Sequence, residues 1–363
     1  MLGSSEKFAV IFCLAGSLLL IASFLGIETS TYLMNLIGQI AAFSLLALSL
    51  DLIWGFCGIL SLGHGLYFAI GGYLVAMHLV KVAFEKTGTP PDFMLFMGWE
   101  DLPAYYFGIE SFAYLLFVVI LVTLSISLIF GYFSFRSRVT GVYFAIITQA
   151  LVYMAMLFMF RNDTGFGGNN GMTGFSEIFG LNFRENKTAT VLCGISLAVL
   201  GLSLLGCKKL VDAPLGRFMR AVKEDESRLR FLGFDTVYVK LTAWCISAIL
   251  AAIAGLLYVP QVGIINPRVL SPELSIEIAV WVAIGGRGSL VGAIFGAVVV
   301  SGLKFILTGL VPELWPFILA ILVVAIVIYL PNGFSDGAKV FGSITKRLGI
   351  EDGTVLKEPL IEY

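Results

Sequence analysis

The chain has 363 residues, of which 58% are hydrophobic and only 13% are charged, and its formal net charge is −1. Soluble domains carry about 25% charged residues. A soluble fold therefore cannot hide this much apolar surface, and most of it must face lipid. The near-zero net charge gives no indication of a nucleic-acid partner.

Apolar runs of about the length needed to cross a bilayer recur along the chain, with short polar breaks between them. Lipid leaves no water for unpaired backbone groups, and the runs lack the alternation of barrel strands, so we expect helices. The predicted fold class is an all-α integral membrane protein with about ten transmembrane helices. These are expected at residues 8–27, 36–56, 66–84, 111–132, 141–160, 188–206, 240–262, 275–285, 289–310 and 314–330.

Two of these runs leave alternatives open. The run at 8–27 has the position of a cleaved signal peptide, but it is about long enough to span the membrane and is interpreted as a helix. The run at 275–285 is short, so it is either a full crossing or a re-entrant or broken helix.

The distribution of basic residues predicts the orientation. The loop at 208–240 carries eight Lys and Arg residues and the link at 133–140 carries Arg136 and Arg138, so both should face the cytoplasm. The acidic loop at 85–110 should face outward. Ten spans then place both termini in the cytoplasm. Residues 1–333 form the predicted polytopic transmembrane domain, and residues 334–363 a cytoplasmic tail.

Glycines mark two further features. The stretch from Trp54 to Gly65 is either plain helix packing or an unwound break at membrane depth, which is tolerated where it lines a cavity. Gly292 and Gly296 lie one turn apart and predict a close approach of two helices.

Polar residues in or near the spans are the candidate lining of a translocation pathway. The candidates are Gln39, Asp51, Ser61, His64, Thr148, Gln149 and Glu277. A charge at mid-bilayer costs about 2.5–3.5 kcal/mol, so both acids must face protein or water, or be protonated.

Structural alternatives remain open for these residues. For Glu277 the alternative is an ion pair with Arg287, and for Asp51 a structural contact is favoured over a pathway role. His64 is expected to pack or cap rather than titrate. The neutral residues suit a small polar solute, or hydrogen bonds between helices. The five cysteines lack metal-ligand spacing and there are two histidines, so no metal site and no catalytic residue are expected.

The cytoplasmic loop contains one amphipathic helix, expected at 214–232. Pro214 begins it, and Leu215, Phe218, Met219 and Val222 share one face at helical spacing. The other faces carry mixed charge, and Gly233 is a plausible stop. A helix lying on the anionic leaflet is the alternative, but the acids at 224–226 weaken it, so we expect docking to a protein.

The sequence contains no Gly-x-x-x-x-Gly-Lys-Ser/Thr loop, and the glycine-rich run 165–171 does not match a dinucleotide fingerprint. If ATP drives this protein, another chain binds it, so no cofactor is expected here.

Several motifs together resemble one family. These are Ala213-Pro-Leu-Gly-Arg217 and the following residues to Asp235, Lys240–Gly255, Gly58-Ile-Leu-Ser-Leu-Gly-His-Gly65 and Gly285-Gly-Arg-Gly-Ser289. In order, from about residue 40 to 333, they resemble the M-type permease subunits of branched-chain amino acid and urea ABC transporters. The outer insertion 90–103 and the run 161–171 look more like the urea branch, so urea is the expected solute, with branched-chain or other amino acids as the alternative.

The resemblance implies a permease of an ATP-driven importer in the bacterial inner membrane. Its partners would be a second homologous permease, two cytoplasmic ATPases and an extracytoplasmic binding protein. The expected ATPase-coupling residues are Leu215, Gly216, Arg217, Arg220, Ala221, Glu224, Asp225 and Gly233. The rival class is an ion-coupled secondary transporter or channel that uses Asp51 or Glu277.

Overall fold

The structure is a computed structural model that describes residues 4–25, 30–88, 90–99, 101–183, 185–329 and 333. The predicted tail at 334–363 lies outside the described residues. Within these ranges the chain is almost entirely helical, as predicted. The strands are short: β1 (Glu177–Ile178) pairs antiparallel with β2 (Leu181–Asn182).

Ten helices of the described ranges correspond one to one with the ten predicted apolar runs. They are α1 (Ser4–Phe24), α2 (Thr31–Cys57), α3 (His64–Thr87), α5 (Phe112–Arg136), α6 (Gly141–Met159), α7 (Asn186–Asp212), α9 (Thr236–Val262), α10 (Pro272–Gly285), α11 (Leu290–Leu310) and α12 (Trp315–Tyr329). Eight of them are long and apolar enough to cross a membrane, whereas α10 and α12 have 14 and 15 residues. The protein is therefore a multi-pass membrane protein.

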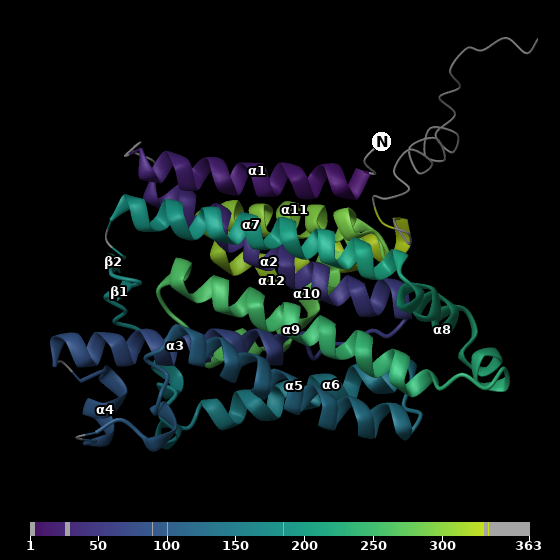
Figure 1. Cartoon of the computed structure of the whole chain (residues 1–363), viewed down its shortest axis with the longest axis horizontal. Coiled ribbons are helices and arrows are strands. Elements are labelled where there is room, and N and C mark those ends of the chain that lie inside the picture. The colour runs from purple at the N-terminus through teal and green to yellow at the C-terminus, as the bar shows by residue number, and fades with distance from the viewer. Residues whose placement is uncertain are drawn as a thin grey trace, which may run out of the picture.

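The remaining helical elements lie in the connections. They are α4 (Asp92–Met97), α8 (Pro214–Phe231) and the short 3-10 turns η1 (Ala104–Tyr106), η2 (Asn162–Thr164), η3 (Gly168–Asn170), η4 (Pro267–Leu270) and η5 (Pro312–Leu314). Figure 1 shows the long helices side by side along one axis, with α8 at one end and α4, β1 and β2 at the other. We call these the α8 end and the hairpin end. The basic loop and the acidic loop thus lie at opposite ends.

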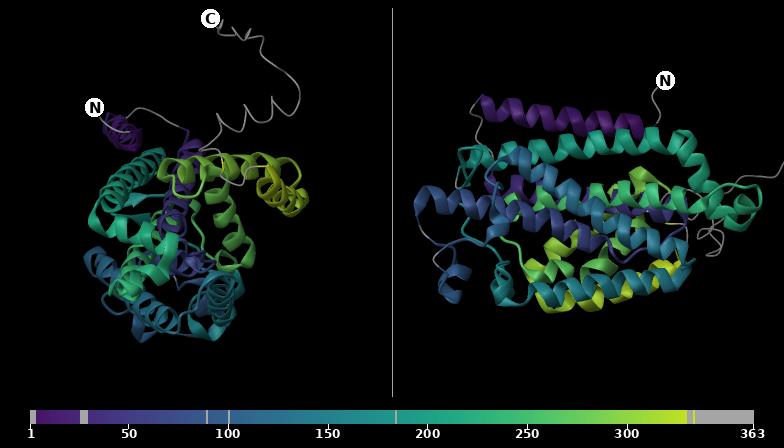
Figure 2. Two further views of the ribbon diagram at one scale, coloured as in Figure 1. Left: turned by 90° about the vertical axis from the view of Figure 1, so that its right-hand side faces the viewer. Right: turned by 60° about the horizontal axis from the view of Figure 1, so that its bottom comes forward.

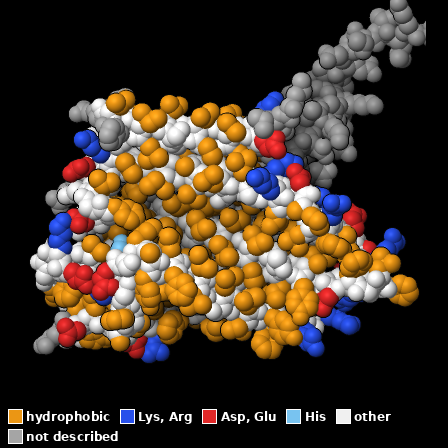
Figure 3. Space-filling model, viewed as in Figure 1, with side chains coloured by type: hydrophobic (Ala, Val, Ile, Leu, Met, Phe, Trp, Pro, Cys, Tyr) orange, Lys and Arg blue, Asp and Glu red, His pale blue; other side chains and the backbone are white. Residues whose placement is uncertain are grey.

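Charge follows the same division. Figure 3 shows Lys, Arg, Asp and Glu side chains gathered toward the two ends, with hydrophobic side chains over the band between them. Among the long helices α2 and α3 are the most buried, and α1 and α5 are among the most exposed. Seen from the α8 end (Figure 2, left), α1 in purple and α12 in yellow stand at the periphery. The polar ends and the apolar band match a bundle that crosses a bilayer.

Small residues set the closest contacts between helices. A Cβ placed on Gly71 of α3 would lie 1.8 Å from the Ala252 carbonyl of α9, and one on Gly16 of α1 would lie 2.6 Å from the Gly194 carbonyl of α7. Contacts this short exclude any side chain, so these backbones touch directly. The helix at 8–27 that was predicted from length therefore packs along α7.

The α10 and α11 helices form an antiparallel hairpin with the same kind of contact. A Cβ on Gly292 would lie 2.1 Å from the Gly285 carbonyl, and one on Gly296 would lie 1.9 Å from the Trp281 carbonyl. The close approach predicted from the glycine pair is confirmed. The hairpin places the turn at 286–289 against α2, where Arg287 lies over the Trp54 ring at 5.5 Å.

Of the two alternatives for the stretch from Trp54 to Gly65, the structure shows the interruption. The α2 helix ends at Cys57, Gly58 adopts a positive φ of 76°, and residues 59–63 are not helical. The segment ends deep in the bundle, because the first residue of α3, His64, contacts Ser247, about 16 Å along α9 from its start. The unwound segment is held there by Thr148 of α6, whose hydroxyl accepts a hydrogen bond from Leu62 N at 3.1 Å.

Candidate functional site

The segment between α7 and α9 is a helix with a break, which corrects the prediction of one continuous helix at 214–232. Asp225 has φ −158° and ψ 98°, which is extended backbone inside α8. Its carboxylate accepts hydrogen bonds from Ser227 N at 3.0 Å and Arg228 N at 3.2 Å. Asp225 thus caps a second helical segment, in the manner of an N-cap, instead of lying on the polar face of the first.

The first segment of α8 is bound to its own membrane domain. Met219 and Val222 are buried, and Leu215, Phe218 and Ala221 are partly buried. Gly216 packs so tightly that a Cβ would lie 2.1 Å from the Val211 carbonyl of α7. The apolar face predicted for this helix is therefore occupied within the chain. Arg217, Arg220 and Glu224 remain exposed.

The second segment ends in an exposed apolar tip. Gly233 has φ +87°, and Phe234 N donates to the Leu229 carbonyl while Gly233 N donates to the Arg230 carbonyl, which is a Schellman ending. The stop predicted at Gly233 is confirmed. We call Phe231, Leu232 and Phe234 the apolar tip. Phe231 is 93% exposed and Leu232 is 72% exposed.

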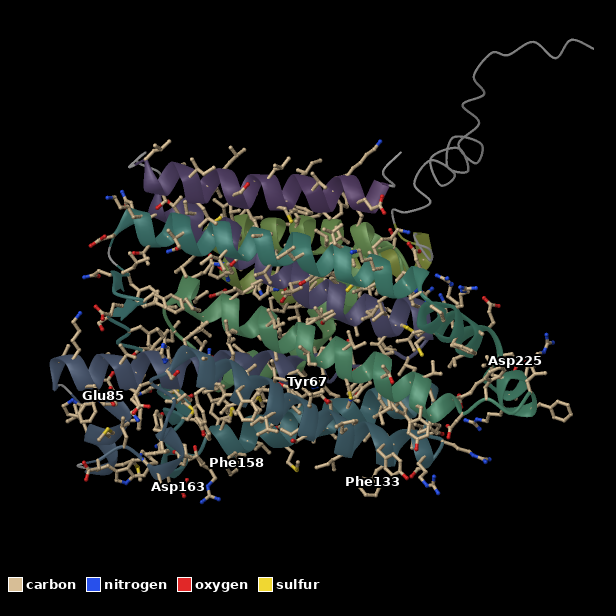
Figure 4. The ribbon with its side chains drawn as sticks, in the orientation of Figure 1. Tyr67, Glu85, Phe133, Phe158, Asp163 and Asp225 are labelled. Carbon is tan, nitrogen blue, oxygen red and sulfur yellow. The ribbon has the colours of Figure 1, made fainter. Side chains whose placement is uncertain are left out.

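The sequence reasoning missed this tip because it followed the apolar face of the first segment. A signal was present, since Phe-Leu-Gly-Phe at 231–234 places large apolar residues around a helix stop in a charged loop. The tip is joined to the first segment through Phe234, whose ring lies 5.1 Å from the ring of Phe218. Figure 4 labels Asp225 at this end of the molecule.

A partly buried charge cluster joins the second segment to α9. The Glu226 carboxylate lies 2.6 Å from Lys240 Nζ, accepts a hydrogen bond from Thr236 Oγ1 at 2.8 Å and pairs with Arg230. Burial alone would raise the pKa of Glu226, but these hydrogen bonds, with Lys240 first, outweigh it and hold that pKa below its usual value. Lys240, whose side chain is 2% exposed, also lies 5.2 Å from the Phe135 ring.

The candidate pathway residues fall into separate groups. Ser61 and His64 lie together at the unwound segment, where His64 Nδ1 is 3.2 Å from Ser61 Oγ and Nε2 is 2.6 Å from Ser247 Oγ. Ser247 in turn donates to the Ser49 carbonyl at 2.5 Å. Because the Ser247 proton is used there, its oxygen accepts from Nε2–H, so a neutral imidazole satisfies the whole chain. This favours the packing and capping interpretation of His64.

Asp51 has a structural partner. It is fully buried, and its Oδ1 accepts a hydrogen bond at 2.7 Å from Gly288 N, in the turn between α10 and α11. Gly55 makes the approach possible, because a Cβ there would lie 2.3 Å from Gly288 N. The contact joins α2 to the α10–α11 hairpin, as the structural alternative proposed.

Glu277 forms an ion pair, but the partner differs from the one predicted. Its Oε2 lies 2.7 Å from Lys304 Nζ of α11, and Glu277 is 2% exposed. Arg287 lies in the turn at the far end of α10, about 15 Å along the helix, and cannot reach. The antiparallel hairpin brings Lys304 beside Glu277 instead.

The same pair lines a cavity of about 510 Å³ on one side of the bundle, bounded by α2, α3, α9, η4 and the last three helices. Arg268 and Glu273 add charges of both signs to the lining. The apolar part of the wall is formed by Phe43, Tyr258 and Trp315. Lys304 Nζ also lies 5.6 Å from the Trp315 ring. The cavity thus combines aromatic surface with paired opposite charges.

The other three candidates are dispersed. Gln39 contacts Tyr258, which lines this cavity, but is not itself a lining residue. Thr148 holds the unwound segment, as described above. The buried side-chain nitrogen and oxygen of Gln149 have no hydrogen-bond partner among the described residues. The structure therefore places Glu277 in the wall of the cavity and Gln39 behind that wall, against Tyr258. It brings Ser61, His64 and Thr148 to the unwound segment, and Asp51 to the α10–α11 turn.

Metal binding has no candidate in the part of the chain that the structure describes, where no group of three or more His, Cys, Asp or Glu residues is placed to hold an ion. The five cysteines are free thiols, and four of them are buried.

Comparison with known proteins identifies one family. The model of the family described as branched-chain amino acid transport system / permease component matches residues 32–327. The chain is 28% identical over 278 residues to the LivM permease protein of the high-affinity branched-chain amino acid transport system of Salmonella typhimurium. The aligned residues cover 70% of this chain and 58% of that protein.

Further relatives agree with this match. The LivM protein of Escherichia coli is 27% identical over 278 residues, with the same coverage of both chains. The LivH protein of Escherichia coli is 25% identical over 276 residues, covering 72% of this chain and 80% of that protein. The chain thus spans 58% of the length of the LivM relatives. No solved structure matches it.

Proposed function

The chain belongs to the family of permease components of branched-chain amino acid transport systems, and we propose that it is the membrane permease subunit of an ATP-driven importer for amino acids. The expectation of a permease component in place of an enzyme agrees with the family. The observation that carries the importer assignment is α8, a broken helix that is fixed to the bundle on one face and exposed on the other.

The ATPase partner follows from this geometry. The sequence has no phosphate-binding loop, so ATP would be bound by separate subunits. Arg217, Arg220, Glu224 and the apolar tip form a surface at one end of the bundle with both charge and large apolar groups, as a protein contact requires. We place this end in the cytoplasm because its loops carry the basic residues. Both termini would then be cytoplasmic, in a bacterial inner membrane.

The solute is proposed to be an amino acid. Urea was predicted from two outer loops, but the relatives named above are branched-chain amino acid permeases, which favours the alternative. The cavity beside α10 supports the same choice, because its charges of both signs and its aromatic wall suit a zwitterion with an apolar side chain. An uncharged solute such as urea needs no such charges.

The other proposed partners are a second homologous permease, which would complete the pathway, a second ATPase and an extracytoplasmic binding protein. LivM and LivH are both named as permease proteins of one kind of transport system, which supports a pair of permeases. The rival, ion-coupled transport, has little support, because Asp51 and Glu277 each have a protein partner.

The test is uptake into proteoliposomes that contain this chain with its ATPase and permease partners and the binding protein. We expect radiolabelled leucine to enter the liposomes only when hydrolysable ATP is present on the side of the membrane that carries the ATPases. Ionophores that collapse ion gradients should have no effect on this uptake. Uptake driven by an ion gradient without ATP would overturn the importer assignment. ATP-dependent uptake of urea but not of leucine would overturn the solute alone.

The orientation has its own test. On a Cys-free background, an impermeant maleimide should label Asp101→Cys from outside sealed cells and leave Arg217→Cys unlabelled until the cells are opened. The reverse pattern would invert the proposed topology.

A further inference from the structure

A groove on the membrane-facing side of the bundle lies between α5 and α6. It has a volume of about 520 Å³, and its walls include Ile126, Ile129, Phe130, Phe133 and Leu151. Phe133 is 66% exposed, and Figure 4 shows it at the outer surface toward the α8 end. The groove begins at the last turn of α5 and extends about 15 Å along that helix. It therefore runs into the apolar band of the bundle.

A basic cleft adjoins the groove at the turn from α5 to α6. Its volume is about 510 Å³, and it is lined by Arg136, Arg138 and Arg230. Ser137 and Val139, which alternate with the first two arginines in the sequence, line the end of the groove. An elongated apolar space and a cluster of cations therefore meet at one short turn.

The acids near the cleft leave two of its cations available. Glu226 pairs with Arg230, and the Asp235 carboxylate accepts a hydrogen bond from Val237 N at the start of α9. Neither Arg136 nor Arg138 has an ion pair with a carboxylate among the described residues, and both are exposed. Arg138 adopts a φ of +58°, a left-handed conformation that costs a non-glycine residue free energy.

We propose that the groove and the cleft together bind one anionic phospholipid of the surrounding bilayer. Its acyl chain lies in the groove between α5 and α6, and its phosphate contacts Arg136 and Arg138. Guanidinium groups bind phosphate oxygens in a bidentate manner, and basic pockets between transmembrane helices are suited to anionic head groups. A lipid accounts for both halves of the site, whereas a soluble anion leaves the apolar groove unexplained. The inference does not depend on the transported solute.

The first experiment compares head groups. The complex that contains this chain, purified in mild detergent, is titrated with palmitoyl-oleoyl phosphatidylglycerol or with phosphatidylcholine of the same chains, and bound lipid is counted by native mass spectrometry. We expect phosphatidylglycerol to bind more tightly. The Arg136→Gln/Arg138→Gln variant should lose about 30-fold in affinity for phosphatidylglycerol, or about 2 kcal/mol, and little for phosphatidylcholine.

Arg161→Gln is the control for this comparison, because Arg161 is an exposed arginine at the hairpin end, far from the cleft. It should bind lipid as the parent does. Equal binding of the two lipids by the parent, or a preference that survives the double substitution, would overturn the proposal. Elution as a single peak in size-exclusion chromatography shows that each variant is folded.

The second experiment examines the groove. Ile129→Trp should obstruct it and weaken both lipids alike, whereas Leu128→Trp, on a neighbouring exposed face outside the groove, should not. Free glycerol phosphate at the same concentration should not displace the lipid, because it lacks the acyl chain. Displacement by glycerol phosphate, or unchanged binding in Ile129→Trp, would mean that the arginines hold only a soluble anion.

Discussion

Gly216 shows how a single residue fixes the position of α8. With a Cβ 2.1 Å from the Val211 carbonyl, Gly216→Ala forces α8 away from the end of α7, since backbone atoms cannot turn aside. We expect a loss of about 1–3 kcal/mol in stability against thermal unfolding in detergent, and lower solute uptake. Gly206→Ala is the matched control, because a Cβ there meets nothing within 4 Å. A variant at Gly216 as stable and active as the Gly206 control would contradict this account.

Substitutions at Asp51 distinguish a structural role of its carboxylate from a role in ion coupling. Its only described hydrogen bond is the one that Gly288 N donates to Oδ1, and an amide oxygen can accept it equally well. Asp51→Asn should therefore retain near-normal uptake. Asp51→Leu leaves the partly buried Gly288 N–H unpaired and should cost about 1–3 kcal/mol of stability. Uptake is measured for variants present in the membrane at equal levels, and its abolition in Asp51→Asn would instead support ion coupling.

At the residue scale the sequence identifies which groups need a partner, but not the partner. The cost of a charge in lipid shows that Asp51 and Glu277 must be paired or solvated. Yet Gly288 lies 237 positions from Asp51 in the chain, and Lys304 is not marked by any motif. The predicted partner of Glu277 was wrong because nearness in sequence does not give nearness in a hairpin.

The charge cluster around Glu226 belongs to the scale of elements, because it joins α8 to α9. Glu226→Gln leaves the Lys240 ammonium buried without a carboxylate and should destabilise the protein by about 3 kcal/mol. Asp212→Asn removes an exposed i,i+4 pair with Lys208 and should cost less than about 1 kcal/mol. Thermal unfolding of both variants provides the comparison, and equal effects would show that the cluster is only a solvated surface.

The same cluster gives a pH dependence with a definite sign. The pKa of Glu226 is lowered from 4.5 in the folded state, so its stabilising contribution is complete above that ordinary value and is lost as the pH falls through the lowered one. The difference in stability between the parent and Glu226→Gln should therefore stay constant near neutral pH and shrink only in acid.

At the scale of elements, the helices were predictable and the break in α8 was not recognised. Apolar runs determine each transmembrane helix locally, because every backbone hydrogen bond is made within the segment. In α8 the amphipathic spacing extends to Val222, and that spacing assigns Asp225 to the polar face. Asp225 with Ser227 and Arg228 after it is also a helix-start signal, which a search for caps within the predicted helix would have found.

The arrangement of the whole molecule could not be read from the sequence, because it depends on contacts between distant helices. The α1 helix packs on α7, and the unwound segment after α2 is held by α6 and α9. Small residues indicate that close contacts exist without indicating with which helix. The basic and acidic loops lie at opposite ends, as the charge pattern predicts, since charge excludes them from the apolar band (Figure 1).

The apolar tip leads to a prediction about the assembled transporter. Phe231 is 93% exposed at the α8 end and packs little against its own chain, so its burial in a partner would remove a large apolar surface from water. A residue that acts as a hot spot of an interface contributes about 2 kcal/mol or more. We expect Phe231→Asp to weaken recovery of the ATPase subunit by about 30-fold in a detergent pull-down, with the membrane domain still folded.

The control for the tip is Phe107→Asp, because Phe107 is 82% exposed in the connection between α4 and α5, at the hairpin end. The same change of an exposed aromatic residue to an acid there should leave ATPase recovery unchanged, since an ATPase contacts only the cytoplasmic end. Coupling adds a second requirement: a contact transmits work only if it differs between the open and closed ATPase states. ATP-driven uptake by Phe231→Asp should therefore fall with recovery. Normal ATPase recovery and normal uptake in Phe231→Asp would show that the tip is not the docking surface.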